Sequence, residues 1–172
     1  MLVFDGPNHV GQLQFRPFIP DTVSPDGLHD PLYWMDFKGH APQLPERSLA
    51  LFCFHVGQLD NSPARDPRYF GRGIGVRLLN ETVKWAASAG FDAVVAKGCP
   101  GFRPIIEYMG GLPAAVYQQQ SFMVAANYHD HDLRATIGEM LVGRFGRDLQ
   151  NALKGVDLDE ASEVSVCVKM LT

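Results

Sequence analysis

The chain has 172 residues, a length typical of one domain and sufficient to bury a sizeable core. Its 46% hydrophobic and 20% charged residues exclude disordered, collagen-like and coiled-coil chains. Because 19 acidic residues outnumber 15 basic ones, the net charge of −4 favours neither nucleic acid nor an anionic membrane as a partner. Most of the twelve prolines precede residue 68, which predicts turns and short strands at the front and longer helices behind.

Several absences indicate the compartment. The first residues contain no basic stretch followed by an apolar one, and no run approaches the roughly 18 apolar residues that span a bilayer. The cysteines Cys53, Cys99 and Cys167 are far apart and match neither a disulfide framework nor a zinc-ligand spacing. The sequence therefore predicts a cytoplasmic protein with reduced, mostly buried thiols.

The first half of the chain contains two predicted strands at the front and one in the centre. Val10–Phe15, with Leu13 and Phe15 on one face, and Tyr33–Phe37 are the two front strands, separated by proline-rich turns. Leu49–Val56 is nearly all apolar and predicts a central strand buried on both faces. No helix of ordinary length is expected in residues 1–48.

A glycine-rich turn follows the central strand. After the polar loop 57–68, Tyr69-Phe-Gly-Arg-Gly-Ile-Gly75 leads into a predicted helix, Val76–Ala89, which Gly90 ends. Phe91–Ala96 is the next predicted strand. The order of strand, turn, helix and strand predicts an α/β unit.

In the second half we expect a helical turn at Ile105–Met109, a helix begun by Pro113 at Ala114–Gln120 and a strand at Phe122–Ala126. A long helix capped by Asp132, Leu133–Leu153, and a last strand, Val164–Met170, follow. No repeat or linker divides the chain. We therefore expect a single domain, 1–172, of the mixed α/β (α+β) class, with a twisted mixed sheet flanked by helices.

The glycine turn has the features of an anion site. Free N–H groups and the macrodipole favour an anion at a helix N-terminus, and Gly71, Gly73 and Gly75 allow a phosphate to approach the backbone. Arg68 and Arg72 could add charge-assisted contacts. The turn lacks the Lys-Ser/Thr pair of the Walker motif and the spacing of the dinucleotide fingerprint. A tight connection with no ligand is the alternative interpretation.

Two motifs resemble those of a known family. The first is Arg/Gln-x-x-Gly-x-Gly/Ala, matched by Arg68-Tyr-Phe-Gly71-Arg72-Gly73 and extended by Ile74-Gly75-x-x-Leu78-Leu79, Trp85-Ala86 and Gly90-Phe91. The second is Tyr-x-x-x-Gly-Phe at a helix end, matched by Tyr117-Gln-Gln-Gln-Ser121-Phe122 with Ser in place of Gly. Over Leu49–Ala126 the chain thus resembles the GNAT superfamily of N-acetyltransferases.

The resemblance implies a GNAT-like fold that binds acetyl-CoA as co-substrate and transfers the acetyl group to an amine by direct attack. It implies that the amides of residues 71–75, Ile74 included, hold the pyrophosphate and that strand residues Phe54–Val56 pair with the pantetheine arm. It also implies that Tyr117 is the general acid. The hydroxyl of a tyrosine stays protonated at neutral pH and could protonate the departing thiolate.

The catalytic assignments have alternatives. Tyr117 could instead be a packed aromatic residue. His55, near the end of the central strand, is a candidate base, directly or through a water, and equally a core histidine. Glu107 and Asp60 are weaker candidates for the base. No Cys-His-acid pattern supports Cys99 as a nucleophile.

Two further clusters of polar residues have simpler interpretations. His129-Asp130-His131 lacks a third ligand, so a solvated loop is favoured over a metal site, and no metal is expected. Arg144, Arg147 and Lys154 alternate with acids, which favours a solvated helix face over a nucleic-acid patch.

The chain departs from the family mainly at its front. The loop between Val56 and Gly71 is long, and the helices that usually wall the acceptor site are reduced or missing. Loops could replace this wall, a partner chain in a homodimer could supply it, or the chain could start late relative to a longer ancestor. The predicted function is N-acetyl transfer to a small-molecule or peptide amine. The alternative is an acyl-CoA-binding or regulatory module with little or no activity.

Overall fold

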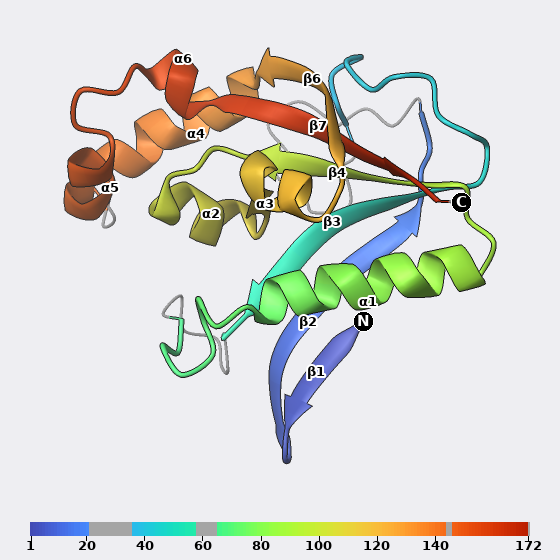
Figure 1. The fold of residues 1–172 in the computed structure, drawn as a ribbon. Coiled ribbons are helices and arrows are strands. Elements are labelled where there is room, and N and C mark those ends of the chain that lie inside the picture. The colour runs from blue at the N-terminus through green and yellow to red at the C-terminus, as the bar shows by residue number, and fades with distance from the viewer. Residues whose placement is uncertain (21–35, 58–64, 144–145, 172) are drawn as a thin grey trace.

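The strands form one mixed seven-stranded sheet in the computed structural model, which describes residues 1–20, 36–57, 65–143 and 146–171 (Figure 1). Among the described strands, only the β3–β4 and β4–β5 pairs are parallel. The mixed α/β class predicted from the sequence is confirmed. The strands in sheet order are β1 (Leu2–Asp5), β2 (Asn8–Pro17), β3 (Ser48–Val56), β4 (Ala93–Cys99), β7 (Glu163–Met170) and β6 (Met123–His129), with β5 (Leu112–Pro113) beside the end of β4.

Helices cover both faces of the sheet. α1 (Ile74–Ser88) and α3 (Ala114–Gln119) pack on one face. The other face is covered by α2 (Arg103–Met109), α4 (His131–Val142), α5 (Gly146–Ala152) and α6 (Leu158–Ala161). We call the two resulting layers the α1-side core, which includes Leu13, Leu49, Leu78, Val94 and Tyr117, and the α4-side core, which includes Val95, Ile105, Ile137, Leu149 and Val166.

The strands alternate between these two cores. In β4, Val94 and Ala96 belong to the α1-side core, while Val95 belongs to the α4-side core. In β3 the alternation is interrupted, because the register with β2 shifts between Gln14 and Phe15. This irregularity lets Leu51 and Phe54 face the same core although they are three residues apart.

Most predicted elements are confirmed within one to three residues at each end. The central strand is buried along nearly its whole length, and Gly90 follows α1 in the left-handed conformation that ends a helix. Leu13 and Phe15 both pack on the α1-side core, as predicted. Strand β1 was not expected, because its pattern in the sequence is too short to indicate a strand. Most of the predicted strand Tyr33–Phe37 lies outside the described residues, and its last two residues are not in a strand.

The single helix predicted over 133–153 is wrong. α4 ends at Val142, and a separate α5 begins at Gly146. A Cβ on Gly146 would lie 2.6 Å from the Leu141 carbonyl oxygen, so glycine is needed where α5 starts against the end of α4. The predicted cap is also corrected, since Asp130 rather than Asp132 caps α4.

The parallel strands β3 and β4 diverge halfway along. They pair from Ser48 and Ala93 as far as Leu51 and Ala96. Beyond this point β4 pairs with β5 instead, and the Phe54 amide of β3 donates to the Gly110 carbonyl at 2.6 Å. The segment between α2 and β5 therefore fills the cleft between the two strands. No helix in the described ranges combines the length and apolar character needed to cross a bilayer.

Candidate functional site

The glycine turn leaves backbone groups open at the start of α1. Gly71 and Gly73 have φ angles of 74° and 79°, in the left-handed region that favours glycine. Gly73 is the N-cap residue, and no side chain caps the helix there. A Cβ at Gly71 or Gly73 would meet no atom within 4 Å, so open space adjoins the turn. These are the backbone features that an anion at a helix N-terminus requires.

A cavity of about 210 Å³ adjoins this turn. Its walls come from the end of β3, the start of α1, α2 and the β5–α3 segment, and they are mostly apolar. The lining residues are Phe54, Val56, Arg65, Phe70, Gly71, Gly73, Ile74, Gly75, Val76, Ile106, Glu107, Gly111, Leu112 and Val116. An apolar cavity beside open backbone N–H groups suits a ligand that has an anionic end and a long, weakly polar arm.

Arg65 is the cationic side chain in this cavity, and sequence reasoning missed it. Its Nη2 donates to the Glu107 carbonyl oxygen at 3.1 Å, which holds the guanidinium against α2. Burial lowers the pKa of Arg65, yet a guanidinium remains charged at neutral pH. Nothing in the local sequence distinguishes Arg65 from the other arginines of the loop, so no signal pointed to it.

The two arginines that the sequence did single out do not line the cavity. Arg68 contacts Asp66 through Nε and through Nη2, the latter at 2.6 Å, and its side chain is 71% exposed. Arg72 is exposed and donates from Nε to the Pro67 carbonyl at 3.4 Å. The other predicted cofactor-binding residues, Phe54, Val56, Gly71, Gly73, Ile74 and Gly75, do lie together around the cavity.

A second, much smaller cavity of about 10 Å³ lies where β3 and β4 diverge. It shares Phe54 and Gly111 with the larger cavity, so the two spaces are neighbours. Its remaining lining residues are Leu51, Phe52, Lys97, Met109, Gly110 and Tyr117. Tyr117, the residue predicted as general acid, thus lines this smaller cavity next to the larger one.

Tyr117 is buried, with 1% of its surface exposed. Its ring packs edge-on against that of Phe122, with the two ring centroids 5.2 Å apart. Burial is the main cause that raises the pKa of Tyr117 well above its usual value, and Cys99 and Cys167 add to the shift. The hydroxyl is therefore a proton donor at neutral pH. Ser121 has a φ of 65°, a conformation that glycine adopts more easily, and stands where the motif that the sequence resembles has glycine.

His55 lies apart from Tyr117. Since Phe54 and Val56 face the α1-side core, alternation turns the intervening His55 to the opposite face of β3. It lines neither of the two cavities. Glu107 does line the larger cavity, and its carboxylate pairs with Arg103 at 2.8 Å. Asp60 lies outside the described residues.

His55 gives the protein an expected pH dependence of stability. Burial lowers the pKa of His55, and the charges of Arg65 and His9 lower it further. Just below pH 6.5 the unfolded chain therefore binds a proton that the folded chain does not, so the free energy of unfolding should rise with pH in this window.

Urea denaturation from pH 5 to 7.5 measures this slope. Replacing His55 by Asn should flatten this slope relative to the wild type. Equal slopes for the wild type and His55→Asn would contradict the assignment.

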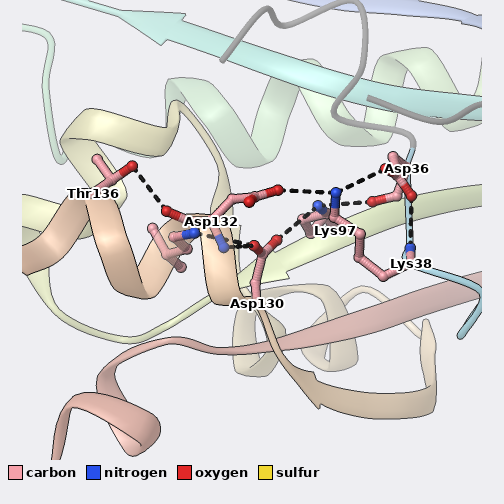
Figure 2. A network of polar contacts seen from close by, with 7 residues as sticks. Asp36, Lys38, Lys97, Asp130, Asp132 and Thr136 are labelled. Carbon is pink, nitrogen blue, oxygen red and sulfur yellow. Dashed lines mark hydrogen bonds and ion pairs between the residues drawn. The ribbon is translucent and has the colours of Figure 1, made fainter. Parts of the chain in front are cut away.

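A partly buried polar network lies on the α4 side of the diverging strands (Figure 2). Lys97 of β4 contacts the Asp130 carboxylate at 3.3 Å and donates to the Asp36 carbonyl at 3.1 Å. Lys38 pairs with both Asp36 and Asp132 at 2.9 Å. Burial lowers the pKa of Lys97, and Asp130 opposes this shift. The network joins residues 36–38, β4 and the start of α4.

The His129-Asp130-His131 sequence is divided among separate structural tasks. His129 contacts the Asp159 carbonyl through Nδ1 at 2.9 Å, while Asp130 caps α4 and pairs with Lys97. Across the described residues, no three His, Cys, Asp or Glu side chains are grouped so that they could hold a metal ion. Cys53, Cys99 and Cys167 are buried, and burial raises the pKa of Cys99 to about 12.

Comparison with known proteins adds no family assignment. Neither a scan against protein-family models nor a search of curated proteins finds a match to this chain.

Proposed function

We propose that this protein is a GNAT-type N-acetyltransferase that uses acetyl-CoA. One observation carries the proposal. The glycine turn lines the 210 Å³ cavity, and Tyr117 lines the smaller cavity that shares Phe54 and Gly111 with it. The diphosphate would lie on the amides of the turn, with Arg65 as an additional cation. The pantetheine arm would then follow the apolar wall, and the thioester would lie near Tyr117.

In the proposed reaction the acceptor amine attacks the thioester carbonyl, the C–N bond forms and the C–S bond breaks. The amine loses a proton, and the departing thiolate gains one from the Tyr117 hydroxyl. His55 faces away from both cavities, so a proton would reach its imidazole only through intervening water. Glu107 is the carboxylate that lines the larger cavity, and it is the alternative base.

The acceptor side would be walled by helices that come late in the chain. The sequence left open what replaces the usual front helices. In the chain α4, α5 and α6 come between β6 and β7. In the structure they cover, together with α2, the sheet face opposite α1. We infer that these helices serve as the acceptor wall for a small-molecule or peptide amine.

One contact favours the second candidate, an acyl-CoA-binding module with little or no activity. The Phe54 amide, which the resemblance assigns to pantetheine, already donates to Gly110. When CoA binds, either the Phe54 amide gives up Gly110 for the pantetheine arm, or residues 109–112 stay in the cleft and the arm does not pair with Phe54. Titration calorimetry with CoA and acetyl-CoA, together with thiol release in the presence of an amine panel, separates the two candidates. Binding without thiol release supports the module, and absence of CoA binding contradicts both.

Replacing Gly73 by Glu tests the location of the cofactor. The new carboxylate would stand against the diphosphate, and like charges brought together cost several kcal/mol, so CoA affinity should fall by more than about 100-fold. Gly155→Glu is a matched control, because Gly155 also has a positive φ, of 81°, and open space around its missing Cβ. Both variants carry the same backbone strain, but only Gly73→Glu should lose CoA. Unchanged affinity would mean that the site lies elsewhere.

A further inference from the structure

The small cavity beside Tyr117 is bounded by Met109, Gly110 and Gly111. The cleft between β3 and β4 is filled by residues 109–112, held by the 2.6 Å hydrogen bond from the Phe54 amide to the Gly110 carbonyl. On the other side, Leu112 pairs with Gly98 of β4. The segment therefore occupies the cleft in the manner of an additional short strand.

The fit of this segment is tight. Gly110 has a φ of 59°, and a Cβ there would lie 3.2 Å from the Phe54 carbonyl oxygen. A Cβ at Gly111 would touch the Cys99 Sγ at 3.4 Å. At Gly110 a side chain would be strained by the positive φ and would press on β3, so glycine lets the backbone enter the cleft. A ligand cannot widen the cleft at this point without breaking packed contacts.

The space that remains is about 10 Å³, which corresponds to roughly one water-sized group. Its walls include Leu51, Met109 and Tyr117, each at most 7% exposed. A methyl group is of this size, whereas a propyl chain is not. Met109, the last residue of α2, is an apolar wall residue with an unbranched, adaptable side chain.

We infer that residues 109–112 restrict the transferred group to acetyl, with Met109 as the specificity-determining residue. This inference rests on the proposed function, since it assumes that the thioester lies beside Tyr117. A longer acyl chain would have to displace Met109 or break the Phe54–Gly110 hydrogen bond. One methylene too many in an apolar pocket is discriminated by about 10- to 200-fold, and butyryl exceeds acetyl by two.

The test compares the dissociation constants of CoA, acetyl-CoA and butyryl-CoA by titration calorimetry on the full chain. The wild type should bind butyryl-CoA at least about tenfold more weakly than acetyl-CoA. Met109→Ala should reduce this ratio to below about threefold, because the shortened side chain opens the wall. Met140→Ala is the matched control, since Met140 packs on the same α4-side core but does not line the cavity, and it should keep the wild-type ratio.

The outcomes separate this inference from the proposed function. If CoA itself does not bind the wild type, the proposed function fails. If CoA and acetyl-CoA bind but butyryl-CoA binds equally well, the function stands and the inference is overturned. An unchanged ratio in Met109→Ala also overturns it. Should that variant not fold, Met109→Val, which removes less of the side chain, provides the same comparison.

Discussion

Replacing Tyr117 by Phe should lower the rate of acetyl transfer by roughly 100- to 10,000-fold, the contribution typical of a positioned general acid. Affinity for acetyl-CoA should change little, because the ring and its packing against Phe122 remain. Burial raises the pKa of Tyr117 well above its usual value, so the hydroxyl carries a proton throughout the neutral range. Transfer assayed by thiol release, with calorimetry for binding, measures the two effects separately.

Tyr128→Phe is the control for this experiment. Tyr128 is also buried, with 5% of its surface exposed, and its hydroxyl has no hydrogen-bond partner among the described residues. It lines neither cavity, so removal of its hydroxyl should leave the transfer rate unchanged. Full activity in Tyr117→Phe would remove Tyr117 from the mechanism and leave it as a packed aromatic residue.

Replacing Asp130 by Ala should lower the free energy of unfolding by about 3–5 kcal/mol, the usual cost of removing one partner of a buried ion pair. Asp130 is 6% exposed and has two tasks. It pairs with Lys97, and its Oδ1 accepts from the Asp132 and Leu133 amides at 3.1 Å, which caps α4 (Figure 2). The variant would leave the Lys97 ammonium buried without its carboxylate and α4 without its cap. Urea denaturation at neutral pH measures the loss.

Three comparisons sharpen this measurement. Asp157→Ala removes an exposed cap, that of α6, without touching a buried cation, and should cost only about 1 kcal/mol. Asp130→Asn keeps an acceptor for the cap but loses the charge, so its loss of unfolding free energy should lie between those of Asp130→Ala and Asp157→Ala. Combining Asp130→Ala with Lys97→Met should recover part of the loss, because no unpaired charge then remains. A cost no greater than that of Asp157→Ala would contradict the role of the pair.

Local patterns in the sequence were sufficient for most of the elements. The apolar run Leu49–Val56 predicted β3, and the helical spacing after the glycine turn predicted α1, because burial of one face imposes a period that can be read from neighbouring residues. The same reasoning failed at 133–153. The apolar stripe there continues across α4 and α5, and both helices do pack on the α4-side core, whereas the local signal for the break is the pair of glycines Gly143 and Gly146.

The candidate site was predicted in part. The glycines of the turn, Phe54 and Val56 were identified, since a glycine turn between a strand and a helix is a local feature, and they do gather around one cavity. Arg65 was missed in favour of Arg68 and Arg72. Which of three nearby arginines enters a cavity depends on a contact such as that of Arg65 with the Glu107 carbonyl, 42 residues away, and no local pattern encodes that.

The sequence by itself thus determined the mixed α/β class, the glycine turn at the start of α1 and the burial of the central strand. Only the tertiary structure decided what fills the cleft between β3 and β4 and what pairs with the buried Lys97. Lys97 meets a carboxylate 33 residues away and a carbonyl 61 residues away. Such contacts depend on how the sheet and helices pack, whereas propensity and periodicity act between neighbours in the chain.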